Sequence, residues 1–430
     1  MDSSRRIGLI SLGCSRNLVD SEKILSDIRR QGGRVVPVEE ASTVIVNTCA
    51  FTQEAKEESI GVICDLLDLK KKGKIKKVLV RGCLSQRYSR ELRQSLPEVD
   101  GFEGVVGFKD RFDRAVRLTP AHLAYMKISE GCAHRCSYCA IPFIKGPLRS
   151  RAVDLILKEA AFLERQGVRE LDIIGQDTTS YGLDRCAGRR GWKKSLPLVV
   201  LLKKILSSTT IPWIRLLYLH PLHVTRELME LVAAQPRICP YIDLPLQHIN
   251  DRILECMNRP LGREKIVRLV RDLRRLIPGV CLRTTLIVGF PSETRKEFQE
   301  LLDFVQTMQF DRLGAFVYSR EEGTPAYAFG SQVSAKEKER RFRRLLSLQK
   351  KISAKIQESK IGRCLDILID EEDAGQGVYL GRTQHDAPEV DGVVYVKSSR
   401  PLKPGAMVRA QVRDAYEYDL VAEVRDESGQ

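Results

Sequence analysis

Three short apolar segments in the first hundred residues each end in a cysteine. The segments are "IGLISLGC", "TVIVNTC" and "KVLVRGC", and their cysteines, Cys14, Cys49 and Cys83, stand 35 and 34 residues apart. A stretch of helical character follows each segment, and strands that alternate with helices predict a parallel sheet. Because parallel strands end at a common edge, where α/β proteins bind ligands, we expect the cysteines to converge. The alternative is that each cysteine only closes the core of its own strand.

A second group of three cysteines lies close together in "EGCAHRCSYCAIP", where Cys132, Cys136 and Cys139 have the spacing C-x-x-x-C-x-x-C. Iron–sulfur clusters and structural zinc normally take four protein ligands, so three thiolates leave one metal position open. A zinc site with His134 as the fourth ligand is the alternative. The other cysteines stand alone, and we expect such cysteines to be small buried residues: Cys64, Cys186, Cys239, Cys256, Cys281 and Cys364.

Beyond this motif, short apolar segments alternate with amphipathic stretches. The apolar segments include "RELDIIGQD", "WIRLLYLHP", "YIDLPLQH" and "TTLIVGFPSE", and each ends in a polar or glycine-containing loop. Successive βα units predict a full or partial parallel barrel with its site at the C-terminal ends of the strands. His220 and His248 each end one of these segments, so they either face that site or are hydrogen-bonded structural residues.

The composition of the chain indicates where in the cell the protein is located. The 430 residues are 43% hydrophobic, and no apolar run approaches the roughly 20 residues that a membrane span needs. The N-terminal stretch has no small-residue cleavage pattern, so we expect no secretory signal, no membrane partner and a cytoplasmic location. Twelve cysteines in a reducing compartment argue against a disulfide framework, and clustered ones indicate metal or redox sites.

A C-x-x-x-C-x-x-C loop after the first strand of a parallel βα domain resembles the signature of the radical S-adenosylmethionine (SAM) enzymes. The resemblance implies that the second cysteine group holds a 4Fe-4S cluster whose open iron binds SAM. "IIGQD" stands where many members carry a Gly-Gly-Glu contact to the SAM amino group, and "LIVGFP" resembles the strand that lines the adenosine. The SAM-binding residues implied in this way are Tyr138, Gly175, Gln176, Asp177, Gly289 and Pro291.

The combination with the N-terminal cysteines resembles the methylthiotransferases over nearly the whole chain. That family carries a second 4Fe-4S cluster, here implied on Cys14, Cys49 and Cys83, and a small C-terminal β-barrel called TRAM. The tail has short alternating segments and a Pro-Gly turn, which is consistent with that barrel. The implied domains are an N-terminal methylthiotransferase domain over residues 1–117, a radical SAM domain over 118–335 and a TRAM domain over 362–430. Between the last two, the helical spacing of apolar residues such as Phe342, Leu345 and Ile352 predicts an amphipathic linker helix over 336–361 with a solvated basic face.

The expected fold class is therefore α/β, with an N-terminal parallel sheet, a central partial (β/α) barrel and a small C-terminal antiparallel β-barrel. Replacing hydrogen at an unactivated carbon is beyond side-chain acid–base chemistry, because no side chain is basic enough to remove that proton. The resemblance implies that a SAM-derived radical removes the hydrogen and that a methylthio group takes its place. Both clusters would act in catalysis, with an external electron donor and a sulfur donor as partners.

The family divides between an aspartate of a ribosomal protein and an adenosine beside the tRNA anticodon. The net charge of +15 favours RNA, but residues 362–430 contain 8 Lys and Arg against 14 Asp and Glu. An acidic tail suits a basic ribosomal protein, and "SLGCSRNLVDSE" and "IIGQDTTSYG" resemble that branch. We therefore expect β-methylthiolation of an aspartate in the twelfth small-subunit ribosomal protein, with direct RNA binding secondary. The alternatives are the tRNA adenosine enzyme and, in another class, a non-catalytic iron–sulfur electron carrier.

Overall fold

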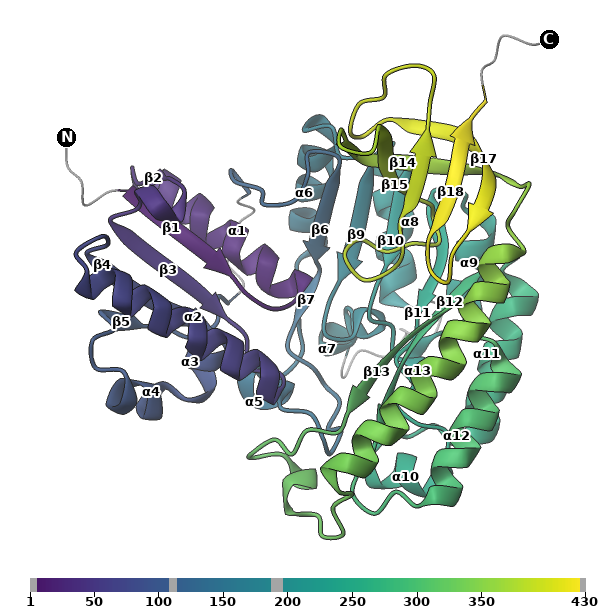
Figure 1. The fold of residues 1–430 in the computed structure, drawn as a ribbon, viewed down its shortest axis with the longest axis horizontal. Coiled ribbons are helices and arrows are strands. Elements are labelled where there is room, and N and C mark those ends of the chain that lie inside the picture. Colours follow the sequence, from purple (N-terminus) through teal and green to yellow (C-terminus); the bar gives the residue numbers. More distant parts are fainter. Residues whose placement is uncertain (1–5, 108–113, 187–195, 426–430) are drawn as a thin grey trace.

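The computed structural model describes residues 6–107, 114–186 and 196–425. Figure 1 shows an N-terminal sheet with its helices, a larger central sheet with helices on its outer side, and a C-terminal barrel that lies against the central sheet. No helix in the described ranges has the length and apolar character that crossing a membrane requires.

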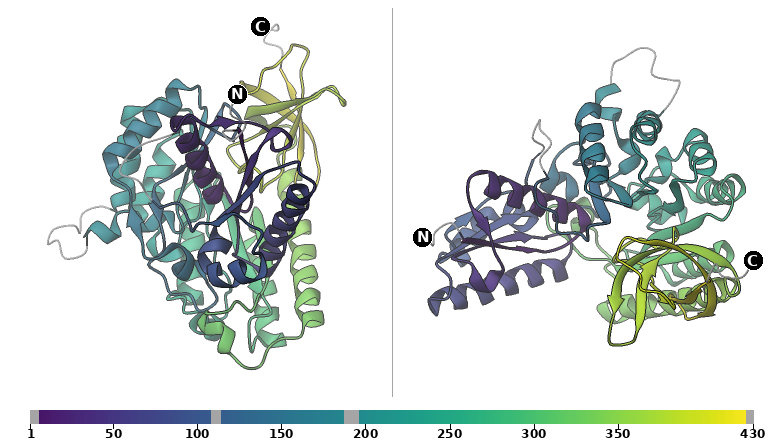
Figure 2. Two further views of the ribbon diagram at one scale, coloured as in Figure 1. Left: turned by 90° about the vertical axis from the view of Figure 1, so that its left-hand side faces the viewer. Right: turned by 90° about the horizontal axis from the view of Figure 1, so that it is seen from above.

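The N-terminal sheet consists of five parallel strands in the order β2-β1-β3-β4-β5. The strands are β1 (Arg6–Ser11), β2 (Arg34–Val35), β3 (Thr43–Thr48), β4 (Lys77–Gly82) and β5 (Gly101–Phe102). Helix α1 (Ser15–Arg30) packs on one face of the sheet and α2 (Gln53–Lys71) on the other (Figure 2). Two short helices, α3 (Cys83–Arg87) and α4 (Ser89–Ser95), follow β4. The strands β1, β3 and β4, which precede the three cysteines, are therefore immediate neighbours.

The central sheet is an open, six-stranded parallel sheet, which confirms the expected partial barrel. Its strands follow the chain order β6 (Leu123–Lys127), β9 (Glu170–Ile174), β10 (Trp213–Leu216), β11 (Ile238–Asp243), β12 (Cys281–Val288) and β13 (Arg312–Val317). The outer layer contains α6 (Val153–Arg165), α8 (Pro197–Ser208), α9 (Arg226–Ala234), α11 (Arg263–Leu276) and α12 (Arg295–Met308). These helices and the strands enclose the largest apolar core of the molecule.

Short elements at the C-terminal ends of the central strands shape the loops of the site. They are β7 (Ser129–Glu130), α5 (Ile141–Lys145), β8 (Arg149–Ser150), η3 (Thr178–Ser180), α7 (Leu183–Cys186), η5 (Pro221–His223), α10 (Asp251–Cys256) and η6 (Pro325–Ala328). The strands β7 and β8 pair with each other, and both flank the loop that carries the second cysteine group.

Helix α13 (Ala335–Glu358) is part of the helical layer and not a free linker. It packs against α12 and β13. The expectation that its basic face is solvated is wrong for Arg341, which is buried and paired with Glu293 at 3.0 Å and Glu337 at 2.9 Å. Gln349 is buried as well and donates to the Phe310 carbonyl at 2.8 Å. The amphipathic pattern of the sequence identified the helix, but it does not reveal polar side chains that find buried partners.

The tail forms a closed five-stranded barrel in the order β14-β15-β16-β18-β17. Its strands are β14 (Cys364–Asp373), β15 (Val378–Arg382), β16 (Val394–Lys397), β17 (Met407–Ala415) and β18 (Leu420–Val424). All pairs are antiparallel except β16 with β18, which is parallel. The predicted small barrel is confirmed, with this one parallel pair as an addition.

The C-terminal barrel is docked on the central sheet by apolar contacts and by buried charges. Leu368 and Ala387 of the barrel share an apolar cluster with Trp213, Tyr241 and other residues of the central strands. Beside this cluster, Arg382 of β15 contacts Glu170 of β9 at 2.5 Å, and Arg215 of β10 contacts the same carboxylate at 2.7 Å. The barrel is therefore joined to the inner part of the central sheet by a buried Arg-Glu-Arg cluster.

Part of the acidity of the tail is used inside the protein. Asp386 pairs with Arg312, and Asp370 pairs with His122 at 2.8 Å, so both carboxylates face the central domain. Among the described residues 362–425, six acidic and seven basic residues are exposed, and five more acidic residues but no Lys or Arg are of intermediate exposure. The surface of the barrel therefore keeps a moderate excess of acidic residues, and docking of a basic partner on it stays a prediction.

The buried cluster leads to a stability prediction. In Arg382→Leu, Glu170 loses one of its two arginine partners in an interface that excludes water. Removing one member of such a buried cluster lowers the free energy of unfolding by about 3–5 kcal/mol. We expect faster amide hydrogen exchange in β14 and β9, measured by mass spectrometry. Arg413→Leu is the control, because Arg413 pairs with Glu423 at 2.9 Å with both side chains about half exposed and its loss costs at most about 0.5 kcal/mol. Equal exchange in the two variants would contradict the role of Arg382.

Candidate functional site

The structure brings Cys14, Cys49 and Cys83 to one edge of the N-terminal sheet. Cys14 caps the N-terminus of α1, Cys49 directly follows β3, and Cys83 is the first residue of α3. All three thiols are free, with Cys14 exposed and the other two buried. A Cβ atom on Gly13, which has a φ of +87°, would lie 2.9 Å from the Cys49 sulfur. The turn before Cys14 therefore needs glycine in order to approach Cys49 so closely.

Cys132, Cys136 and Cys139 lie on the loop between β7 and α5, at the C-terminal end of the central sheet. The loop is fixed mainly through Ser137, whose amide donates to the Met257 carbonyl at 3.0 Å and whose hydroxyl donates to the Cys256 carbonyl at 2.7 Å. The guanidinium of Arg259 approaches the Cys136 sulfur at 3.8 Å. The three thiols are therefore held on a loop that is tied to the loop after α10.

Both cysteine groups lie beside the junction where the N-terminal domain docks on the central domain, because α3, which begins with Cys83, packs against α5, which follows Cys139. The hydroxyls of Ser15 and Tyr218 are 3.1 Å apart across this junction. Beside them, Lys145 of α5 contacts Asp20 of α1 at 3.0 Å, and Lys127 of β6 contacts Glu130 at 2.5 Å and also Asp20. The four charged side chains of this junction cluster are each at least 97% buried.

The junction explains the basic stretch "KGPLRSR" that follows the second cysteine group. Lys145 belongs to the junction cluster, and Arg151 pairs with Glu159 at 2.6 Å in a buried position. Arg149 is exposed. Two of the three basic residues therefore stabilise the structure.

Burial governs the protonation of most of the six thiols. It raises the pKa of Cys132 to about 11 and that of Cys139 to about 12. Burial also raises the pKa of Cys83 to about 12, against the opposing charge of Lys145. Cys14 is exposed, but the protein packed around it still opposes ionisation of its thiol. The charge of Arg16 and hydrogen bonds from Asn17 and Arg16 outweigh this effect, so the pKa of Cys14 is lowered. A bound metal cluster would stabilise all six as thiolates.

Most of the residues with an implied role in SAM binding lie next to elements that carry or flank the second cysteine group. Gly175 follows β9, and a Cβ atom there would lie 2.6 Å from the Ser129 hydroxyl, which has no hydrogen-bond partner. Tyr138 packs on the apolar cluster that contains Phe290. In the sequence, Phe290 stands between Gly289 and Pro291, the two implied residues of the later strand end. Gly289 has a φ of +72°, and its amide donates to Glu293. Gln176 is half-buried.

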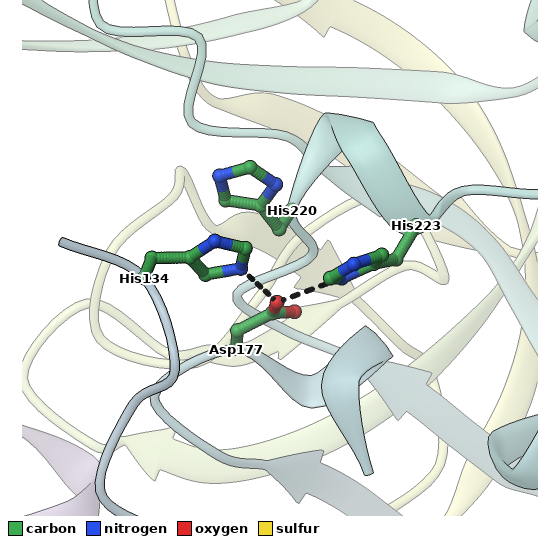
Figure 3. Close-up of side chains that lie close together, drawn as sticks. All are labelled: His134, Asp177, His220 and His223. Atoms are coloured by element: carbon green, nitrogen blue, oxygen red, sulfur yellow. Dashed lines mark hydrogen bonds and ion pairs between the residues drawn. The ribbon is translucent and has the colours of Figure 1, made fainter. Parts of the chain in front are cut away.

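Asp177 is the centre of a histidine cluster that the sequence did not reveal. Its Oδ2 atom accepts from His134 Nε2 at 2.7 Å and lies 3.2 Å from His223 Nδ1 (Figure 3). The ring of His220 stacks on that of His134 with centroids 3.7 Å apart. Ligand atoms of these four residues lie within 4.8 Å of one another, a spacing that a metal ion could use. The carboxylate also accepts hydrogen bonds from Thr179 and Ser180, so both oxygens of Asp177 are engaged within the protein.

The surroundings of the histidine cluster shift the pKa values of Asp177 and His220. Burial alone would raise the pKa of Asp177, but its hydrogen bonds from His134, His223, Ser180 and Thr179 hold it well below the usual range. Burial and the charge of Arg259 lower the pKa of His220 to about 2, so its imidazole is neutral. The Nδ1 atom of His220 accepts from the Leu222 amide at 3.2 Å, while its buried Nε2 has no partner. His220 therefore presents an unpaired N–H group beside the second cysteine group.

The structure also tests the predictions for His134, His248 and the isolated cysteines. His134 turns its Nε2 atom toward Asp177, which argues against a zinc site with the cysteines. His248 is buried away from the histidine cluster, and its Nδ1 accepts from the Asn250 amide at 3.0 Å, as expected of a structural histidine. Of the isolated cysteines, Cys239 and Cys281 are buried, Cys256 and Cys364 are intermediate, and Cys64 is exposed, contrary to expectation. The side chain of Cys186 lies outside the described residues.

His223 was missed by the sequence analysis, and so was Arg16. The spacing "HPLH" after a predicted strand could have indicated that His220 and His223 lie on one turn. Arg16 stands two residues after Cys14, but nothing in the sequence shows that its side chain crosses to another domain.

The burial of the thiols leads to a reactivity prediction. In the cluster-free protein, iodoacetamide should alkylate Cys14 several-fold faster than Cys49 and Cys83, because Cys14 is exposed and its pKa is lowered. Between pH 7 and 9 the rate at Cys14 should level off first, while Cys83, with a pKa raised to about 12, stays slow. Mass spectrometry of peptides measures the rates, with exposed Cys64 as the accessibility control. Equal rates at the three cysteines would contradict this arrangement.

Comparison with known proteins identifies each part of the chain. A model of the "Radical SAM superfamily" matches residues 126–305, a "TRAM domain" model matches residues 361–424, and a model of "Uncharacterized protein family UPF0004" matches residues 6–104. Among solved structures, the cobalamin-dependent S-adenosylmethionine radical enzyme OxsB is similar in fold, with a TM-score of 0.50 and 12% identity over 81% of this chain and 56% of that chain.

Curated relatives match over almost their full length. The ribosomal protein uS12 methylthiotransferase RimO of Desulforamulus reducens is 43% identical, over 97% of this chain and 99% of the relative. The protein of the same name from Clostridioides difficile is 41% identical, over 97% of this chain and 98% of the relative. The chain therefore belongs to the RimO family of radical SAM methylthiotransferases.

Proposed function

We propose that this chain transfers a methylthio group to the β-carbon of an aspartate in ribosomal protein uS12. The observation that carries the proposal is the 43% identity to a uS12 methylthiotransferase over 97% of the chain and 99% of the relative. The arrangement of the two cysteine groups supports it, because each offers three free thiols and both lie beside the junction of the two domains.

The residues at both cysteine groups fit 4Fe-4S clusters. Cys14, Cys49 and Cys83 would hold one cluster, and the second group, Cys132, Cys136 and Cys139, would hold the other. The close approach of Gly13 to the Cys49 sulfur leaves no room for a side chain on that turn. Three thiolates per cluster leave one iron open, as the binding of SAM or of a sulfur species requires.

When bound, the clusters and SAM supply the electron, the carbon-centred radical and the sulfur and methyl groups that side chains cannot supply. The side chains and backbone of the protein hold the two cluster sites in position and shield them from water. The Met257 and Cys256 carbonyls hold the loop of the second cysteine group, and the junction cluster of Asp20, Lys127, Glu130 and Lys145 holds the two sites against each other. An external electron donor and a sulfur donor are further requirements of the reaction.

The histidine cluster has a positioning role in this proposal. Asp177 binds His134, which lies between Cys132 and Cys136, and so ties the cysteine loop to the end of β9. The unpaired buried Nε2–H of His220 and the unpaired Ser129 hydroxyl lie among the residues implied in SAM binding. A buried polar group without a partner costs about 1–3 kcal/mol, so both donors favour a polar ligand at this place.

Modification of a tRNA adenosine is the alternative substrate. The moderate excess of acidic residues on the surface of the C-terminal barrel favours a basic protein over RNA. The assignment to uS12 depends mainly on the named relatives and on the sequence motifs. A non-catalytic electron carrier is disfavoured, because such a protein has no use for two incompletely ligated clusters and a site for SAM.

Iron content tests the assignment of the cysteines. After anaerobic reconstitution, the wild-type chain should bind about eight iron atoms, the number in two 4Fe-4S clusters. A triple Cys→Ala variant of Cys14, Cys49 and Cys83 should keep about four, and so should the corresponding variant of Cys132, Cys136 and Cys139. Cys64→Ala, at an exposed isolated cysteine, should keep all eight. Full iron content in either triple variant would refute the assignment of that group.

The substrate is tested by mass spectrometry of uS12 and of total tRNA from cells with and without the gene. We expect the methylthio mass increment to disappear from uS12 alone, and to return when the wild-type gene is restored. A gene carrying Cys132→Ala should not restore it, because the site for SAM would be lost. Loss of the modification from tRNA alone would overturn the proposed substrate.

A further inference from the structure

Arg16 connects the two cysteine groups physically. It lies in the first turn of α1, two residues after Cys14, and its side chain reaches out of the N-terminal domain. Its Nη1 atom donates to the Gly175 carbonyl at 3.1 Å, at the end of β9. Its guanidinium carbon lies 4.1 Å from the centre of the Tyr218 ring, which follows β10. One side chain therefore joins the first cysteine group to two strand ends of the central sheet.

Arg16 lies beside both cysteine groups. On one side it is two residues from Cys14, in the first turn of the helix that Cys14 caps. On the other side its partner Gly175 comes two residues before Asp177, whose carboxylate accepts from His134, between Cys132 and Cys136. One guanidinium charge is therefore placed next to the first group and at longer range from the second.

Two features indicate that the position of Arg16 is held for a ligand. Its Nε atom is buried without a hydrogen-bond partner, although it carries a donor hydrogen. Tyr218, on which the guanidinium stacks, has a φ of 61°, which costs a non-glycine residue on the order of 1 kcal/mol. The Tyr218 amide donates to Asp243 at 2.9 Å, and this contact helps to hold the strained conformation. A strained support and an unpaired donor are both typical of a site that binds an anionic group.

We propose that Arg16 is a positioning residue shared by the two cluster sites, which fixes their separation and places one positive charge between them. The inference rests on the proposed cluster chemistry, and it goes beyond it by assigning a residue that is not a cluster ligand. Hydrogen bonds to ligating sulfur and nearby positive charge raise the reduction potential of an iron–sulfur cluster. Arg16 therefore raises the potential of the Cys14 cluster strongly and that of the Cys132 cluster weakly.

The first test measures potentials without any substrate. Reductive titration of the reconstituted full-length protein, followed by electron paramagnetic resonance, is carried out in the two triple Cys→Ala backgrounds so that each cluster is observed alone. Arg16→Leu should lower the midpoint potential of the Cys14 cluster, with a smaller decrease at the Cys132 cluster. Arg16→Lys keeps the charge and should lie between the wild type and Arg16→Leu.

Arg30→Leu is the matched control. Arg30 lies on the same helix, α1, fourteen residues further on, which is roughly 21 Å by helical rise. That distance exceeds the Debye length of about 8–10 Å, so its removal should leave both potentials unchanged. Equal shifts in Arg16→Leu and Arg30→Leu, or no shift in Arg16→Leu, would overturn the electrostatic part of the proposal.

The second test measures positioning. The ratio of 5′-deoxyadenosine released to methylthiolated product reports how well the two sites are aligned. Arg16→Lys cannot reproduce the planar guanidinium that both stacks on Tyr218 and donates to Gly175, so this ratio should rise several-fold. An unchanged ratio in Arg16→Lys would refute the positioning role, and iron content shows that the variant is folded and loaded.

The outcomes separate this inference from the proposed substrate. If the wild-type protein leaves uS12 unmodified, the proposed substrate fails, while the potentials of the two clusters still test the role of Arg16. If the wild type modifies uS12 and Arg16→Leu keeps both the potentials and the ratio, the inference about Arg16 alone fails.

Discussion

The reactive part of this protein depends on a junction between two domains that is built from buried charges. Lys127 and Lys145 of the central domain meet Asp20 of the N-terminal helix and Glu130 of the central domain, all excluded from water. Charges in such a position are tolerated only when each has a close partner. A displaced N-terminal domain would leave several of them unpaired, so the junction strongly favours a single docking geometry. The two cysteine groups lie beside it and take their relative position from it.

The C-terminal barrel is attached by the same physical means. Arg382 and Arg215 share the Glu170 carboxylate, and Asp386 pairs with Arg312 of β13. The acidic residues of the tail therefore serve in part to bind the protein's own central domain. Only part of the charge counted along a sequence reaches the surface where oppositely charged residues meet inside the molecule, as Asp386 and Arg312 do here.

Local chemistry was readable from the sequence, in some cases to the residue. The strand-ending cysteines predicted a parallel sheet, and the spacing of Cys132, Cys136 and Cys139 indicated a metal-binding loop. The histidine cluster was not readable, because Asp177 and His223 lie on different loops that are brought together only by neighbouring strands. Helix α13 was recognised by its periodicity, but the burial of Arg341 depends on a partner, Glu293, that lies 48 residues away in the chain.

The sequence by itself determined which segments form strands, where cysteines end them and which cysteines stand together, because periodicity and short-range spacing control local conformation. Only the tertiary structure decided that β1, β3 and β4 are neighbours, that Arg16 reaches Gly175 and Tyr218, and that two carboxylates of the tail, those of Asp370 and Asp386, face the central domain. These features depend on strand order and on contacts between residues far apart in the chain. Their energies arise from desolvation and pairing in the folded molecule, and no local pattern in the sequence records them.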